Sequence, residues 1–132
     1  MNKLEGKIAE VQSSDNISII KIDVEGDLFS SIILEGERTP LNYKTGDDVS
    51  VLFKEAEVGI AKNLTGLISL RNRFKGVIKK VRRAPILAEI TLAYRDHEIR
   101  SIISTQSADK LALKEGDEVE WLVKSNEVTL MR

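Results

Sequence analysis

The chain has 132 residues, of which 42% are hydrophobic and 31% are charged, and its formal net charge is −1. This balance is typical of a soluble globular protein and excludes a disordered or membrane-spanning chain. The absence of cysteine excludes disulfides and thiol chemistry, and a single histidine, His97, argues against catalytic metal sites, so we expect no enzyme. The first residues lack the apolar core of a signal peptide, so we expect a cytoplasmic protein with no membrane partner.

The N-terminal half is predicted to form a series of short strands. Its segments are rich in Ile and Val and partly alternate in polarity, with Gly or Asp between them, as in strands that bury one face. Five such segments follow one another, at 3–11, 17–26, 28–34, 48–54 and 56–60. A short connection, AKNLTGLI at 61–68, comes next.

The C-terminal half repeats the N-terminal half at an offset of 70 residues. GDDVSVLFKEAEV at 46–58 aligns without a gap with GDEVEWLVKSNEV at 116–128. A fixed offset of this kind indicates a duplicated structural unit. We therefore expect two domains, at 1–62 and 69–132.

The segment before the second GD turn is predicted to form a short helix, with Ser104 or Thr105 as its cap and Gly116 as its stop. Five strands and one short helix in about sixty residues are typical of a small barrel of the oligonucleotide/oligosaccharide-binding type. The predicted fold class is therefore all-β, with two tandem five-stranded barrels and one short helix in each. Barrels of this size bury little surface, so we expect the copies to pack on each other or on other subunits.

The two copies differ in charge. Residues 1–66 hold 7 Lys+Arg and 12 Asp+Glu, a net of −5, whereas residues 67–132 hold 13 and 9, a net of +4. Acidic and basic copies can dock on one another, within a chain or between chains. Alternatively, only the basic copy handles an anion, and both interpretations can hold together.

The second copy resembles the molybdenum-pterin-binding (Mop) module, also called the TOBE domain. The resemblance rests on the opening SLRNRFKG at 69–76, the helix segment from 104, and the closing Lys-Ser at 124–125. The tandem arrangement is similar to the di-Mop molbindins. It implies binding of molybdate or tungstate for intracellular storage, buffering or homeostasis, with no organic cofactor. It also implies sites between neighbouring modules in a homo-oligomer, a trimer first and a dimer next.

The chemistry of such a ligand selects the candidate residues. A tetrahedral dianion only accepts hydrogen bonds, so its site needs hydroxyl, amide and cationic donors rather than carboxylates or a bare metal cation. The candidate oxyanion-binding residues are Ser69, Leu70, Arg71, Asn72, Ser104, Ser107, Lys124 and Ser125, with Lys54 as a weaker candidate. For Asn72, which repeats as Asn2, fixing the entry to a strand is the preferred interpretation.

Some positions depart from the family pattern. Leu70 stands where the family usually has Ala. In the first copy, Met1 directly precedes Asn2, Leu34 replaces Ser104, and Glu55 replaces Ser125, where a carboxylate would repel a dianion. We therefore expect the first copy to be a scaffold with a degenerate site.

Two alternatives remain open. Barrels of this type also bind nucleic acid, and KGVIKKVRRAP at 75–85 is a basic run, but nucleic-acid partners are disfavoured because aromatics make up only 5% of the chain. The other alternative is a structural or partner-binding module whose anion site has decayed.

Overall fold

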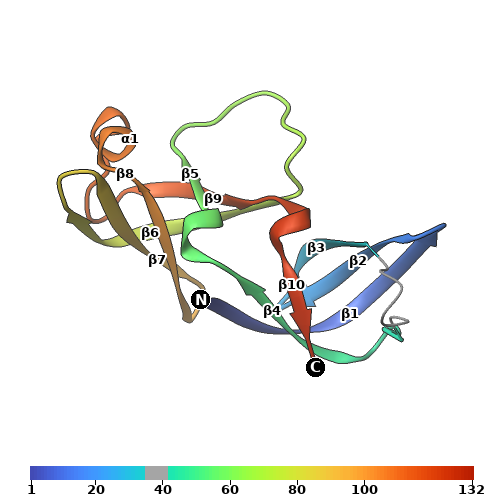
Figure 1. The fold of residues 1–132 in the computed structure, drawn as a ribbon. Helices are drawn as coiled ribbons and strands as arrows, with labels where there is room; N and C mark the ends of the chain where they lie inside the picture. Colours follow the sequence, from blue (N-terminus) through green and yellow to red (C-terminus); the bar gives the residue numbers. More distant parts are fainter. Residues whose placement is uncertain (35–41) are drawn as a thin grey trace.

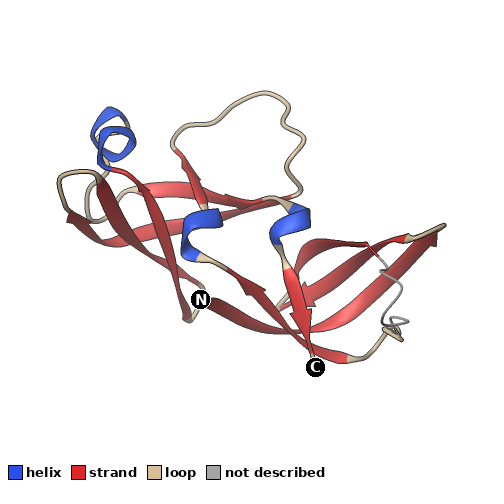
Figure 2. Ribbon diagram, in the orientation of Figure 1, coloured by secondary structure: helices blue, strands red, loops and turns tan. Residues whose placement is uncertain are grey.

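The computed structural model describes residues 1–34 and 42–132, which form two five-stranded antiparallel sheets and little helix (Figures 1 and 2). The first repeat contains β1 (Asn2–Ser14), β2 (Ile17–Val24), β3 (Asp27–Leu34), β4 (Asp48–Phe53), the 3-10 helix η1 (Glu55–Glu57) and β5 (Gly59–Ala61). The second contains β6 (Asn72–Arg83), β7 (Leu87–Tyr94), β8 (His97–Ser104), α1 (Thr105–Lys110), β9 (Glu118–Val123), the 3-10 helix η2 (Ser125–Glu127) and β10 (Thr129–Met131). The all-β prediction with five strands in each copy is confirmed.

The predicted helix of the second copy is confirmed as α1, but it ends at Lys110, with Leu111 as its C-cap, so the predicted stop at Gly116 is wrong. Ser104 is its N-cap, and the Ser104 side chain accepts a hydrogen bond from the Ser107 backbone N–H, as expected for a hydroxyl at this position. The corresponding helix expected in the first copy falls on residues 35–41, which lie outside the described residues. The two 3-10 helices follow β4 and β9 and were not predicted; Figure 2 shows both of them between the two sheets.

The two sheets exchange their last strands. Their strand orders are β10-β4-β1-β2-β3 and β5-β9-β6-β7-β8, so β5 of the first repeat completes the second sheet and β10 of the second repeat completes the first. Figure 1 shows this exchange, with the green β5 beside β9 and the red β10 beside β4. The ranges 1–62 and 69–132 therefore delimit repeats of the sequence, and each repeat lends its last strand to the other sheet.

Alternation of polarity explains which face of each sheet is buried. In β2, Ile20, Ile22 and Val24 are buried, whereas Lys21 and Asp23 between them are exposed, which is the period of two expected for a strand with one solvated face. The long first strands β1 and β6 each pair with two partners, β4 and β2 in the first sheet and β9 and β7 in the second. Each has a register shift where it changes partner, which bends the sheet.

The core between the repeats is aromatic. Trp121 is 0% exposed and stacks on Phe53 of the first repeat at 5.6 Å between ring centroids. Phe29 stacks on Phe74 at 4.2 Å, and Tyr94 meets Trp121 edge-on at 5.1 Å. Five of the six aromatic residues of the chain are therefore used for packing the two repeats together.

Opposite charges also meet where the repeats touch. In the turn between β2 and β3, Asp27 accepts a hydrogen bond from the Tyr94 hydroxyl at 2.6 Å and pairs with Arg95 at 3.2 Å. Glu25 contacts the His97 ring at 2.7 Å. Burial, and then the hydrogen bond to Asp27, raise the pKa of Tyr94. These contacts join an acidic hairpin of the first repeat to Arg95 and His97 in the β7–β8 hairpin of the second. No helix in the described part of the chain is long and apolar enough to cross a membrane.

Candidate functional site

The pairing of β6 with β9 brings the two ends of the motif together. Residues 69–71 precede β6 directly, and Lys124 and Ser125 follow β9 directly. In the antiparallel register Asn72 lies opposite Val123, so the residues just before one strand lie next to the residues just after the other. The opening and closing parts of the sequence motif are therefore neighbours in space, although more than fifty positions separate them.

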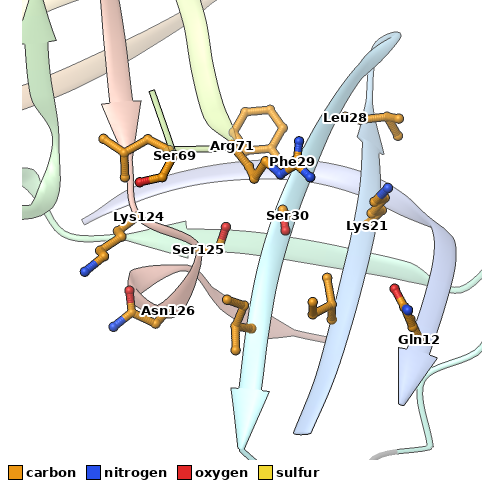
Figure 3. Close-up of a pocket in the computed structure, with 13 residues that line it drawn as sticks. Gln12, Lys21, Leu28, Phe29, Ser30, Ser69, Arg71, Lys124, Ser125 and Asn126 are labelled. Carbon is orange, nitrogen blue, oxygen red and sulfur yellow. The ribbon is translucent and has the colours of Figure 1, made fainter. Parts of the chain in front are cut away.

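A cavity of about 590 Å³ opens at this junction. Its wall combines the motif with strands β2 and β3 of the first repeat (Figure 3). The lining residues are Gln12, Ile19, Lys21, Leu28, Phe29, Ser30, Ile32, Ser69, Leu70, Arg71, Lys124, Ser125 and Asn126. In Figure 3, Lys124 and Asn126 lie on one side of Ser125 and Ser30, and Lys21 and Gln12 lie on the other. Five predicted site residues, Ser69, Leu70, Arg71, Lys124 and Ser125, are thus brought together.

The cavity carries positive charge without a compensating carboxylate. Its described wall contains Lys21, Arg71 and Lys124 and no Asp or Glu. Among the described residues, no hydrogen bond or ion pair holds the guanidinium of Arg71 or the ammonium of Lys124. Arg73, two positions after Arg71, instead forms a two-pronged pair with Glu120, which lowers the pKa of that carboxyl. The cations at the cavity are therefore available to an anion.

Asn72 does not line the cavity, and its side chain binds the backbone of the other repeat. Its side chain is fully buried, with Nδ2 donating to the Ser30 carbonyl at 2.9 Å and Oδ1 accepting from the Ser30 N–H at 2.7 Å. The repeat-related Asn2 holds the backbone of Arg100 in the same way, at 2.8 and 2.9 Å. Both asparagines therefore fasten the start of one repeat to a strand of the other, in line with the preferred interpretation of Asn72.

Ser104 and Ser107 do not line this cavity. Their hydroxyls lie 2.8 Å from each other at the start of α1, and the Ser104 oxygen also accepts from the Ser107 N–H at 3.0 Å. Within one chain these two candidates form a helix cap. They could contact the ligand of a cavity only from a neighbouring copy of the chain.

The position in the first repeat that corresponds to the cavity carries different charges from the cavity. Lys54 and Glu55 there correspond to Lys124 and Ser125, and the Glu55 carboxylate forms an ion pair with the amine of Met1. The hydrogen bond and charge of this amine, with a smaller contribution from Arg100, lower the pKa of Glu55 despite some desolvation. A carboxylate of the chain itself therefore lies beside the cations of this position.

Sequence reasoning missed the part of the cavity wall that belongs to the first repeat. Gln12, Lys21 and Ser30 line the cavity but are not part of the sequence motif. Their place depends on how β3 of the first repeat lies against the start of β6, and only the three-dimensional contact through Asn72 reveals it. Over residues 1–34 and 42–132, the structure has no group of three His, Asp or Glu side chains that could hold a metal ion.

Comparisons with known proteins identify the family of the chain. The family model of the TOBE domain matches residues 68–130. The chain is 37% identical over 65 residues to molybdenum-pterin-binding protein 1 of Clostridium pasteurianum, which covers 48% of this chain and 96% of that protein. It is 31% identical over 84 residues to the molybdenum import ATP-binding protein ModC of Haemophilus ducreyi, covering 64% of this chain and 24% of that protein.

Two solved structures are similar in fold. The cytoplasmic molybdate-binding protein ModG, crystallised with molybdate bound, superposes with a TM-score of 0.91 over 98% of this chain and 94% of that chain, at 23% identity. A molybdate-binding protein from Sporomusa ovata superposes with a TM-score of 0.50 over 51% of this chain and 100% of that chain, at 30% identity. The first comparison covers both repeats, and the second covers about one.

Proposed function

Because the chain belongs to the TOBE-domain family of molybdenum-pterin-binding proteins, we propose that it binds molybdate in the cavity between its two repeats. The observation that carries this proposal is that two cations, Arg71 and Lys124, line one cavity whose described wall contains no carboxylate. Two positive charges match the charge of a tetrahedral dianion. Tungstate has the same charge and nearly the same shape, so we propose that it binds at the same place.

Different residues of the motif would contribute hydrogen bonds, positive charge and apolar contacts to binding. The Arg71 guanidinium can donate two parallel charge-assisted hydrogen bonds, and Lys124 supplies a compact positive charge. Ser69 and Ser125 can each donate from a hydroxyl, and Ser125, at 6% exposure, would do so from a partly dehydrated position. Leu70 contributes apolar wall rather than a polar contact.

Further donors would come from a second copy of the chain. Ser104 and Ser107 do not line the cavity of their own chain, so we propose that they approach the site of a neighbouring copy in a homo-oligomer, a trimer first and a dimer next. Lys54 remains a weaker candidate, because its neighbour Glu55 opposes a dianion. Light scattering of the purified protein at micromolar concentration tests this assembly, and a monomer would contradict it.

The biological role that we propose is intracellular storage, buffering or homeostasis of the oxyanion, in the cytoplasm, without catalysis and without an organic cofactor. The candidate groups donate hydrogen bonds to a ligand, and none of them is placed as a nucleophile or a general base. The nucleic-acid alternative is not favoured, because the aromatic residues it would need for stacking are used in the core between the repeats. The decayed-site alternative is not favoured either, because the opening and closing parts of the motif, with Ser69, Arg71, Lys124 and Ser125, line one cavity.

Isothermal titration with molybdate, tungstate and sulfate tests the proposal directly. We expect binding of molybdate and tungstate, and a rise in melting temperature that corresponds to about 2.7 kcal/mol at a hundredfold excess over Kd. Arg71→Ala should weaken binding by about 1.5 to 3 kcal/mol, because a charge-assisted hydrogen bond is lost. Arg82→Ala is the matched control, since Arg82 is exposed and lies outside the cavity. If none of the three anions produces a heat of binding or a shift in melting temperature, oxyanion binding is refuted.

A further inference from the structure

The wall of the cavity opposite the motif belongs to the first repeat and includes a third cation. Lys21 on β2 lines the cavity together with Ser30 on β3. The β2–β3 register places these two residues directly opposite each other, so their side chains share one face of the sheet. The first repeat, whose own site is degenerate, therefore presents a hydroxyl and an ammonium to the site of the second repeat.

Asn72 fixes this wall relative to the motif. It follows Arg71 in the chain, and its buried amide holds the backbone of Ser30 through both hydrogen bonds described above. An amide that satisfies a buried N–H and C=O together is costly to displace. A short chain of contacts thus runs from Arg71 through Asn72 and Ser30 to Lys21, and it sets the distance between the two sources of positive charge.

The Lys21 ammonium is only weakly engaged within the chain. Its one ion pair among the described residues is with Glu10, at 3.6 Å, and its side chain is 45% exposed. By comparison, Lys7 and Lys79 are 2.7 and 2.8 Å from their carboxylate partners. Exposed pairs at the longer distance contribute little free energy. Lys21 can therefore turn toward a ligand at low cost.

We propose that Lys21 is a third cationic group of the anion site and that it makes the site select ligands by charge. This inference rests on the proposed function of the cavity. Arg71 and Lys124 balance a dianion, and a third cation adds attraction that is proportional to the charge of the ligand. A doubly charged oxyanion therefore gains about twice as much from Lys21 as a singly charged oxyanion of the same tetrahedral shape. The first repeat thus contributes to specificity although its own site lacks the motif.

The test compares molybdate with perrhenate, a tetrahedral oxyanion with a single charge. Dissociation constants would be measured by titration calorimetry for the wild-type chain, Lys21→Gln and the matched control Lys7→Gln, whose lysine lies outside the cavity. We expect Lys21→Gln to weaken molybdate binding by about fivefold and perrhenate binding by about twofold at low salt. Both differences should shrink as salt rises to about 0.5 M, because Lys21 is exposed to screening. Lys7→Gln should change neither.

The possible outcomes separate the inference from the function on which it rests. If the wild-type chain binds neither molybdate nor tungstate, the proposed function fails. If the wild-type chain binds molybdate and Lys21→Gln binds it equally well, the function stands and the role of Lys21 is refuted. An equal loss for molybdate and perrhenate would also refute selection by charge, since it would indicate a change in shape rather than in electrostatics.

Discussion

The cavity at Arg71 and Lys124 and the repeat-related position at Lys54 and Glu55 have the same backbone surroundings but opposite electrostatics. Each lies where a β-strand leads into a short 3-10 helix, and each is fastened to the other repeat by a buried asparagine. Among the described residues, no carboxylate lines the first, whereas in the second Glu55 is paired with the amine of Met1. The comparison teaches that the same junction of strand and 3-10 helix can carry different charges, and that under the proposed function a few side chains decide whether an anion can bind there.

The largest effect should follow from replacing Ser125 in the cavity with glutamate, the residue that the first repeat has at the corresponding position, Glu55. Ser125→Glu introduces a carboxylate where the proposed ligand lies, and two unit charges about 4 Å apart near a protein surface repel by about 4 kcal/mol. We therefore expect molybdate binding to be lost in a titration. Ser125→Ala, which removes only a hydroxyl, should cost about 1 kcal/mol. Unchanged affinity in the Ser125→Glu variant would show that the ligand lies elsewhere.

The two asparagines sharpen the comparison because they are alike in structure and should differ in function. Asn72→Ala leaves the buried N–H and C=O of Ser30 without partners, and Asn2→Ala does the same to the partly buried backbone of Arg100, so each should lower the free energy of unfolding by about 1 to 2 kcal/mol. Denaturant unfolding measures this loss. Only Asn72→Ala should also weaken molybdate binding, since only Asn72 positions a wall of the cavity. Equal effects of both variants on binding would refute this distinction.

The lysines that follow β4 and β9 offer a matched pair of substitutions. Lys124→Ala should weaken molybdate binding by about 1.5 kcal/mol, because a charge-assisted contact is lost. Lys54→Ala should change it by less than about 0.5 kcal/mol, because Lys54 lies beside Glu55 rather than in the cavity. Titration of both variants at the same ionic strength provides the measurement. The reverse order of effects would move the site to the first repeat.

The smallest effect concerns two glutamates at the same repeat position. Glu57 accepts a hydrogen bond from the Lys54 N–H at 2.8 Å, whereas burial, and then the neighbouring Glu57, raise the pKa of Glu127. A carboxyl with a raised folded-state pKa stabilises the fold below its ordinary pKa of 4.5, and this contribution is lost as pH rises through the folded-state pKa. Glu127→Gln should therefore raise the free energy of unfolding at pH 7 by about 0.5 kcal/mol.

The pH dependence provides the control for this substitution. The gain in melting temperature of Glu127→Gln over the wild-type chain should be larger at pH 7 than at pH 4.5. A gain that is the same at both values would indicate a change in packing instead of the removal of a charge. Glu57→Gln, which alters the capping hydrogen bond, should not give the same gain.

Local sequence patterns were sufficient to predict the strands, the helix α1 and the place of the motif. Alternation in β2 and the hydroxyl at Ser104 are properties of neighbouring residues, so they are visible in the chain itself. The repeat and the resemblance to the family indicated that motif residues 69–71 belong to the same site as Lys124 and Ser125. These parts of the site depend on one antiparallel pairing, of β6 with β9.

Contacts between the repeats could not be predicted in this way. The exchange of β5 and β10 places each strand in a sheet that its own sequence does not specify, because the two repeats carry similar patterns at these positions. Lys21 and Ser30 enter the cavity wall only because Asn72 fastens β3 to the start of β6. Long-range contacts of this kind have no local signature, and they supply half of the candidate site.

The exchanged strands also determine how the chain can fold during synthesis. β4 has its partner β10 at residues 129–131, so the first sheet stays incomplete until almost the whole described sequence has left the ribosome. Pairings between segments this far apart in sequence are slow to form. Until then the edge of β4 is open to a strand from another nascent chain. Slower translation lengthens this interval, so it should lower the yield of correctly closed molecules.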